Sequence, residues 1–146
     1  MSAKRIPVLL AVCMFSIEAY AAPLYVSLSG SHTPPFSSWA TAATNIQAAI
    51  DAAHDGDMVL VTNGTFVLSS AVNVHTGVVV KSVNGPAYTT LNGAGATRCV
   101  NLSRSNAVVD GFTITGGFSD VGGGAYLTAG TTLKNCMIID NRASAM

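Results

Sequence analysis

The spacing of hydrophobic and polar positions changes at Asp57. Between residues 46 and 53, apolar side chains recur at i, i+3, i+4 and i+7, which predicts an amphipathic helix. Thr44 or Asn45 can cap its start, and Gly56 can end it. The apolar face is narrow and built from small residues. We therefore expect the helix to cover the end of a larger apolar structure rather than to join a helix bundle.

From Asp57 onward, short apolar runs are separated by Gly, Asn and Ser, which predicts many short β-strands. An earlier strand is predicted at Leu24–Leu28, before a loop at Gly30–Ser38. The candidate strands after Asp57 are Met58–Val61, Val72–Val74, Val78–Ser82, Thr89–Leu91, Cys99–Leu102, Ala107–Val109, Phe112–Thr115, Ala125–Leu127, Thr131–Leu133 and Cys136–Ile139. Such runs are too short for the hairpins of a stable sandwich, so the informative test is a search for an internal repeat.

The chain contains such a repeat. Val109–Thr115 aligns with Leu133–Ile139 at an offset of 24 residues, and Leu102 aligns with Leu127 at an offset of 25. The difference of one residue corresponds to a slip within a turn.

The aligned positions carry the chemistry that stacked coils require. Gly111 coincides with Asn135, and these two residue types readily adopt the left-handed conformation of a sharp bend. Apolar character is kept at Val109 and Leu133, Phe112 and Cys136, and Ile114 and Ile138. The pattern predicts an all-β fold, a right-handed parallel β-helix of about four coils. Val78–Ser82 fits an earlier coil, with Pro86–Gly95 as an enlarged turn that accounts for the longer spacing of about 30 residues.

The first 21 residues have the organisation of a secretory signal peptide. Lys4 and Arg5 form a positive region, Ile6–Ile17 an apolar stretch, and Ala19–Ala21 a small-x-small cleavage site. The apolar stretch is shorter than the roughly 20 residues that span a bilayer. Leu10–Cys13 also resembles a lipobox, but its third residue is bulky and the apolar run continues beyond it, which favours an ordinary signal peptide.

The chain of 146 residues is long enough for one domain. The predicted organisation is a signal peptide at 1–21, an N-terminal strand, loop and capping helix at 22–56, and β-helix coils at 57–146. The sequence stops at Met146, just after a coil that resembles an interior repeat. Because terminal repeats normally carry a polar cap, we expect the chain to be truncated at its C-terminus.

Composition supports an exported chain with a neutral surface. Only 10% of residues are charged, against about 25% in typical domains. Seven basic and seven acidic residues cancel, which argues against nucleic acid as a partner. No segment after the signal is apolar enough to be transmembrane. Cys99 and Cys136 remain in the mature chain and could form a disulfide, but their strand-like surroundings favour buried thiols.

The repeat, the helix and the turns together resemble a known family. Residues 24 to 143 resemble secreted bacterial right-handed parallel β-helix proteins of the pectate-lyase-like superfamily, and are most similar to the repeats of polymorphic outer-membrane proteins. The stretches that carry the resemblance are Ser38–Thr41 with Asn45–Ala53, Gly56–Phe66, Gly111–Gly117 with Gly122–Tyr126, and Leu133–Ala143. The resemblance implies the fold and export more strongly than any activity, because this fold hosts enzymes, adhesins and passive stalks.

A pectate lyase would require a calcium-binding Asp cluster and an arginine base, and the resemblance implies both. The sequence has no dense acidic motif, and the arginine-containing signatures of these enzymes are absent. His32, His54 and His75 are scattered, so no metal site is predicted. We therefore assign no catalytic residue and no cofactor, with calcium possible only in a lyase.

The remaining candidates have a structural and a functional interpretation. Asp110 and Lys134 occupy equivalent places on adjacent coils and can form a surface ion pair. Asp120 in a Gly-rich turn could bind a ligand or calcium, although an Asp in such a turn usually accepts backbone N–H groups. Asp140–Arg142 could contact a sugar, although a solvated turn is favoured.

Two aromatic residues, Trp39 and Tyr126, could stack on a sugar, but an edge or core position is favoured for both. Gly122–Gly124 lacks the Lys and the long helix of a phosphate loop.

Two functions remain open. The favoured one is a non-enzymatic scaffold or adhesin-like segment, secreted or held at a bacterial outer surface, with polysaccharide or cell-surface components as partners. The alternative is the N-terminal part of a pectate-lyase-like enzyme that degrades polysaccharides.

Overall fold

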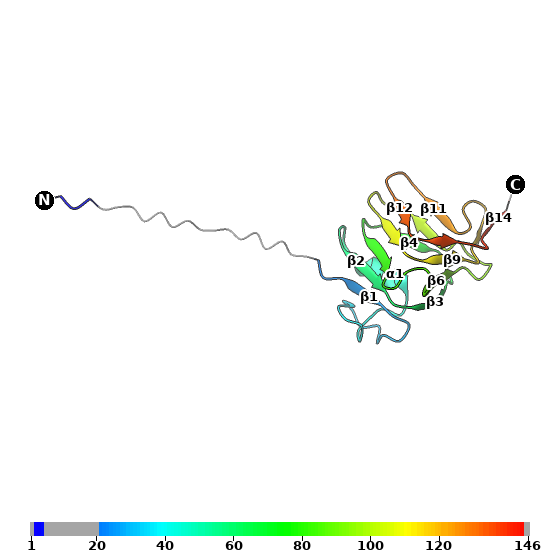
Figure 1. Ribbon diagram of the computed structural model, residues 1–146, viewed down its shortest axis with the longest axis horizontal. Coiled ribbons are helices and arrows are strands. Elements are labelled where there is room, and N and C mark those ends of the chain that lie inside the picture. The colour runs from blue at the N-terminus through cyan, green and yellow to red at the C-terminus, as the bar shows by residue number, and fades with distance from the viewer. Residues whose placement is uncertain (1, 5–20, 145–146) are drawn as a thin grey trace.

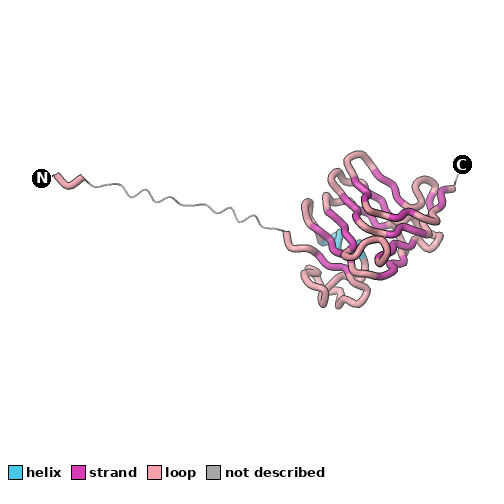
Figure 2. The backbone as a smooth tube through the Cα atoms, viewed as in Figure 1, coloured by secondary structure: helices cyan, strands magenta, loops and turns pink. Residues whose placement is uncertain are grey.

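The chain winds into a parallel β-solenoid (Figure 1). The computed structural model describes residues 2–4 and 21–144. Most of the predicted signal peptide, residues 5–20, lies outside this part. Within it, all paired strands run parallel. Figure 2 shows that loops connect these short strands and that helix is confined to one place.

The elements follow one another in a regular cycle. In chain order they are β1 (Leu24–Val26), α1 (Ile46–Ala52), β2 (Met58–Val61), β3 (Gly64–Val67), β4 (Val72–Val74), β5 (Val79–Ser82), β6 (Thr89–Asn92), β7 (Val100–Leu102), β8 (Val108–Asp110), β9 (Thr113–Thr115), β10 (Phe118–Ser119), β11 (Ala125–Leu127), β12 (Thr132–Lys134), β13 (Met137–Ile138) and β14 (Arg142–Ala143). The main sheets have the strand orders β1-β2-β5-β8-β12, β3-β6-β9-β13 and β4-β7-β11, and β10 pairs with β14.

Three coils are complete, because β2–β3–β4, β5–β6–β7 and β8–β9–β11 each supply one strand to every main sheet. β12 and β13 continue into the next coil. The prediction of an all-β parallel β-helix with a short capping helix is confirmed.

The predicted repeat is the observed register. Leu133 pairs with Val109, Ile138 with Ile114, and Leu127 with Leu102. Gly111 and Asn135 both have left-handed backbone, with φ of 85° and 52°, so they make the predicted bend. An added Cβ at Gly111 would also lie 2.8 Å from the Ser82 hydroxyl, so any other residue there would have to displace that side chain.

Two predictions about the earlier coils need correction. Val79 pairs with Val108 at an offset of 29, but Thr90 pairs with Thr113 at an offset of only 23. The extra residues therefore lie before β6, in residues 83–88, and the predicted enlarged turn at Pro86–Gly95 was placed too late. β3 was also missed, because no strand was predicted between Val61 and Val72.

Inward-facing residues of the three sheets form continuous apolar rows. One row runs through Val59, Val80 and Val109, and another through Phe66, Leu91 and Ile114. All of these side chains are buried. The core is thus a stack of like residues along one axis, with each coil covering the one before it.

Helix α1 covers the N-terminal end of this stack, as predicted. Asn45 caps it by accepting a hydrogen bond from the Ala48 backbone N–H at 2.8 Å. Ile46, Ala49 and Ile50 are buried, and α1 packs against β1, β2 and β4.

Gln47 of α1 closes the free edge of β4. Its side-chain oxygen accepts a hydrogen bond from the Asn73 backbone N–H at 2.8 Å. Its side-chain nitrogen donates to the Asn73 carbonyl at 3.1 Å. The amide thus replaces a neighbouring strand and satisfies a sheet edge that would otherwise be open.

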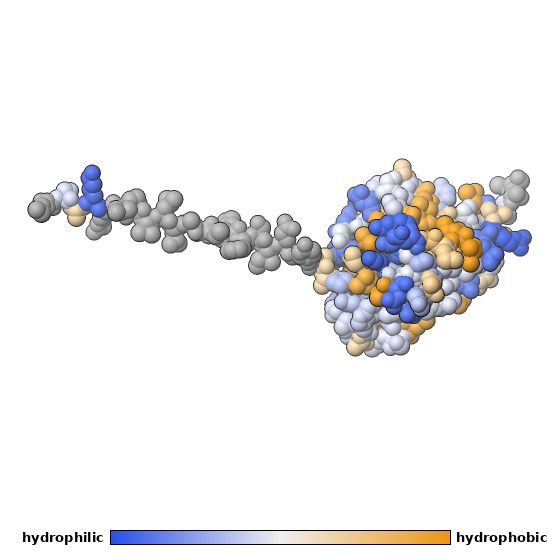
Figure 3. Space-filling view, in the orientation of Figure 1, coloured by the Kyte–Doolittle hydropathy of each residue, from blue (hydrophilic) through white to orange (hydrophobic). Residues whose placement is uncertain are grey.

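The other end of the stack is more exposed. Ile138 occupies the row of Ile114 but is 53% exposed, and Met137 and Ile139 are also exposed. Figure 3 shows apolar side chains gathered in the half of the molecule where β9 and β11 lie, next to strongly polar ones.

The stacked core predicts unequal costs for one substitution at two equivalent positions. Ile114→Ala removes a fully buried side chain and should lower the free energy of unfolding by about 2–5 kcal/mol. Ile138→Ala should cost roughly 1 kcal/mol or less, because that side chain stays half in water. Urea denaturation measures both, and equal shifts of the midpoint would contradict the stacking.

Candidate functional site

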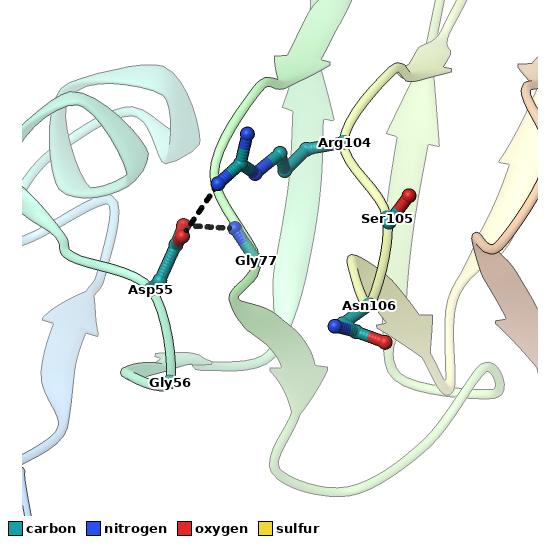
Figure 4. Close-up of a pocket in the computed structure, with 6 residues that line it drawn as sticks. All are labelled: Asp55, Gly56, Gly77, Arg104, Ser105 and Asn106. Carbon is teal, nitrogen blue, oxygen red and sulfur yellow. Dashed lines mark hydrogen bonds and ion pairs between the residues drawn. The ribbon is translucent and has the colours of Figure 1, made fainter.

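The turns between the third and first sheets stack and form a hollow of about 420 Å³. Asp55 and Gly56 come from the turn after α1, Gly77 from the turn before β5, and Arg104 from the turn after β7 (Figure 4). One Asp55 carboxylate oxygen accepts the Gly77 N–H at 2.7 Å, and the other accepts the Arg104 guanidinium at 2.9 Å. The carboxylate therefore joins three successive turns.

These two contacts set the charge state of the hollow. The hydrogen bond from Gly77, followed by that from Arg104, lowers the pKa of Asp55 below its ordinary value. A carboxylate held ionised by two donors is a poor proton carrier near neutral pH. The geometry fits a structural clasp better than general acid or base chemistry.

The predicted Asp110–Lys134 ion pair is present, with 3.6 Å between the charged atoms. The sequence analysis expected a surface pair, but Asp110 is buried, with 8% of the residue exposed. Asn135 also donates a hydrogen bond to it at 2.8 Å. Lys81, which the sequence analysis did not connect with this pair, lies in register on the other side of Asp110. Charges of alternating sign thus follow one outward row of the sheet.

The turn residues considered as sugar contacts serve the fold. Asn141 donates to the carbonyls of Ile114 and Ile139 and accepts the Gly117 N–H at 2.7 Å. Its amide therefore lies inside the stacked turns and holds them together, whereas Asp140 and Arg142 beside it are exposed. Asp120 accepts the Ser144 hydroxyl at 2.9 Å rather than the backbone N–H expected in its turn.

The glycines at 122–124 allow close packing of backbones. A Cβ on Gly123 would collide with the Arg142 carbonyl.

Each histidine has a separate local partner. Thr44 donates its backbone N–H to His32, and His54 and His75 lie 3.6 and 3.8 Å from Asp57 and Asp51. In residues 2–4 and 21–144, no group of three or more His, Cys, Asp or Glu side chains could hold a metal ion.

Cys99 and Cys136 are both free, which confirms the interpretation as thiols. Burial raises the pKa of each. Neither is therefore activated as a nucleophile.

Tyr126 is partly covered by a cation. The Arg98 guanidinium lies 5.0 Å from the centre of the ring. Arg98 also donates to the carbonyls of Val121 and Gly122, so it holds the 119–122 turn against the coil below.

Trp39 lies beside a second hollow, of about 370 Å³, lined by Thr62, Asn63, Val83 and Asn84. Trp39 comes from the N-terminal loop, and the other residues from the β2–β3 and β5–β6 turns. The side-chain amides of Asn63 and Asn84 are joined by a hydrogen bond of 2.8 Å. The sequence pointed to Trp39 alone.

Neither hollow was predicted from the sequence. Asp55, Gly77 and Arg104 are spaced by 22 and 27 residues, close to the length of one coil, and this spacing was the available signal. It could be used only after the unequal lengths of the coils were known.

No protein-family model matches the chain, and no curated protein or solved structure is significantly similar to it. The parallel β-solenoid therefore rests on the structure, and the resemblance to the pectate-lyase-like superfamily stays an expectation. No helix in the described part of the chain has the length and apolar character to cross a membrane.

The Asp55 clasp predicts a pH-dependent contribution to stability. The unfolded chain has an ordinary Asp pKa of about 3.9 and the folded one a lower pKa, so the contribution is present above about pH 4 and lost as the pH falls through the folded-state pKa. The melting temperature of the unmodified chain should fall more steeply in acid than that of Asp55→Asn. Circular dichroism measures this. Asp140→Asn removes a carboxylate from another turn and should keep the unmodified slope, whereas equal slopes for all three proteins would refute the clasp.

Proposed function

We propose that the chain is an exported β-helix scaffold with an adhesin-like role, secreted or held at a bacterial outer surface, and without catalytic activity. Its partners are polysaccharide or cell-surface components. The solenoid supports this proposal, because stacked coils form a long and regular surface from short repeats.

The observation that carries the proposal is the use of the aspartates within the fold. Three of them, Asp55, Asp110 and Asp120, accept hydrogen bonds from a neighbouring coil. Two others, Asp51 and Asp57, accept hydrogen bonds within their own helix or turn. Enzymes that cleave polysaccharides need carboxylates that are free to bind calcium or to move protons. In this chain, three carboxylates hold neighbouring coils together and two more are engaged locally.

Support for export comes from the sequence. A positive region, an apolar stretch of about 12 residues and a small-x-small site follow one another in the order of a signal peptide. A surface with few charges and many neutral polar side chains agrees with an extracellular scaffold.

Activity on polygalacturonate tests the absence of catalysis. We expect no release of unsaturated oligogalacturonides, followed by ultraviolet absorbance, with or without calcium, and no rise in melting temperature with calcium. Turnover that is lost in Asp110→Asn or Asp140→Asn would reject the scaffold and favour a pectate-lyase-like enzyme.

The mature N-terminus tests export. In a secreting bacterial host, the protein outside the cytoplasm should begin at Ala22, because cleavage is expected after Ala21. Intact mass spectrometry measures this. Ala21→Phe, which blocks the small position, should leave the precursor uncut, and an intact unmodified chain confined to the cytoplasm would refute export.

A further inference from the structure

The hollow beside Trp39 combines an accessible aromatic ring with paired amides. Trp39 is 41% exposed, and the Tyr25 ring meets it at 68° with 4.5 Å between the ring centres. Tyr25 lies on β1 and thereby fixes the indole against the solenoid. By contrast, the other candidate aromatic, Tyr126, already has the Arg98 guanidinium over its ring.

The two asparagines present complementary hydrogen-bonding groups. Asn84 donates one side-chain N–H to the side-chain oxygen of Asn63. Since each amide has two N–H donors and one carbonyl, this bond leaves both N–H donors of Asn63 and the carbonyl and second N–H of Asn84 for other partners. Neighbouring hydroxyls of a sugar ring can both donate and accept, so they match this pair.

The backbone that carries these groups is fixed by the coils. The Val83 N–H bonds to the Val61 carbonyl at 2.9 Å, and the Gly64 N–H to the Tyr88 carbonyl at 2.9 Å. The turns are therefore held in place before a ligand arrives, which reduces the entropy lost on binding.

The lining restricts the class of ligand. It contains an indole, an isopropyl group, a hydroxyl and two amides, and no ionisable side chain, so it offers no positive charge to a uronate or a phosphate. The strands beside it pair with each other, β2 with β5 and β3 with β6, so a peptide finds no open strand edge between them. A purely apolar ligand would leave the amides without partners.

We propose that this hollow binds a neutral pyranose unit of a polysaccharide, with the sugar ring against Trp39 and its hydroxyls on Asn63 and Asn84. The volume of about 370 Å³ lies within the range of about 300–1,000 Å³ for small-molecule sites. The inference deepens the proposed adhesin-like role. It rests on that role only for the place where the protein would meet a polysaccharide, outside the cell.

Tryptophan fluorescence gives a direct test, because Trp39 is the only tryptophan in the chain. The purified full chain is titrated with cellohexaose, xylohexaose and mannohexaose, and with trigalacturonate as the anionic comparison. We expect a saturable change in emission with at least one neutral hexasaccharide and a weaker response to trigalacturonate.

Substitution of the amides separates this site from general adsorption. Asn63→Ala combined with Asn84→Ala should weaken binding about tenfold, as expected for the loss of two hydrogen bonds. Asn101→Ala, on the neighbouring sheet, should bind like the unmodified chain. Thermal unfolding of all three proteins verifies that they are folded.

Two outcomes would overturn the proposal: no saturable change with any neutral hexasaccharide, or unchanged affinity in the folded double variant. Either result is independent of the mature N-terminus and of the polygalacturonate assay, so failure of the sugar site is distinct from failure of the scaffold proposal.

Discussion

Parallel hydrogen bonding between coils places each side chain above its counterpart at the roughly 4.8 Å spacing of neighbouring strands. An apolar residue that repeats from coil to coil then packs against its counterparts. A charged residue that repeats lies close to the same charge on the next coil and is repelled by it. The outward rows follow this constraint. Thr65, Thr90 and Thr113 share one row, and Asn101 donates to Asn73 in another. Where charges occur in a row, at Lys81, Asp110 and Lys134, their signs alternate. The low charge of the chain is therefore a consequence of its stacking.

The same constraint makes the ends of the stack the places where the fold needs special side chains. At the first coil, Gln47 gives β4 the two hydrogen bonds that a strand would supply. The backbone of Phe36 and Ala43 does the same for β1, by accepting from Tyr25 and Ser27. The N-terminal segment is thus irregular because it must supply hydrogen bonds to the edge strands of the first coil without forming another coil. That irregularity also brings Trp39 next to two regular turns.

The sequence predicted the later coils better than the earlier ones, and the reason is the length of their turns. Between β8–β9 and β12–β13 the turns are equal, so an offset of 24 aligned Gly111 with Asn135 and gave the correct register. Six extra residues before β6 broke the same comparison one coil earlier. The Asp55 hollow depends on that earlier register, because Asp55 meets Arg104 across 49 residues, whereas Asn63 meets Asn84 across 21, which is the offset between β2 and β5. Such contacts follow from the sequence only when every intervening turn is placed.

Function in this fold depends on what the turns leave free after the stack is stabilised. Catalysis on a sugar requires unengaged carboxylates, whereas recognition of a neutral sugar requires only a ring and a few neutral hydrogen-bonding groups. Asp55 and Asp110 are held by partners from neighbouring coils, so their charge is used for cohesion. Asn63 and Asn84 form one hydrogen bond with each other, and their remaining N–H and carbonyl groups could bind a ligand. The hollow beside Trp39 is where the turns leave neutral groups unengaged, and the proposed binding role rests on those groups.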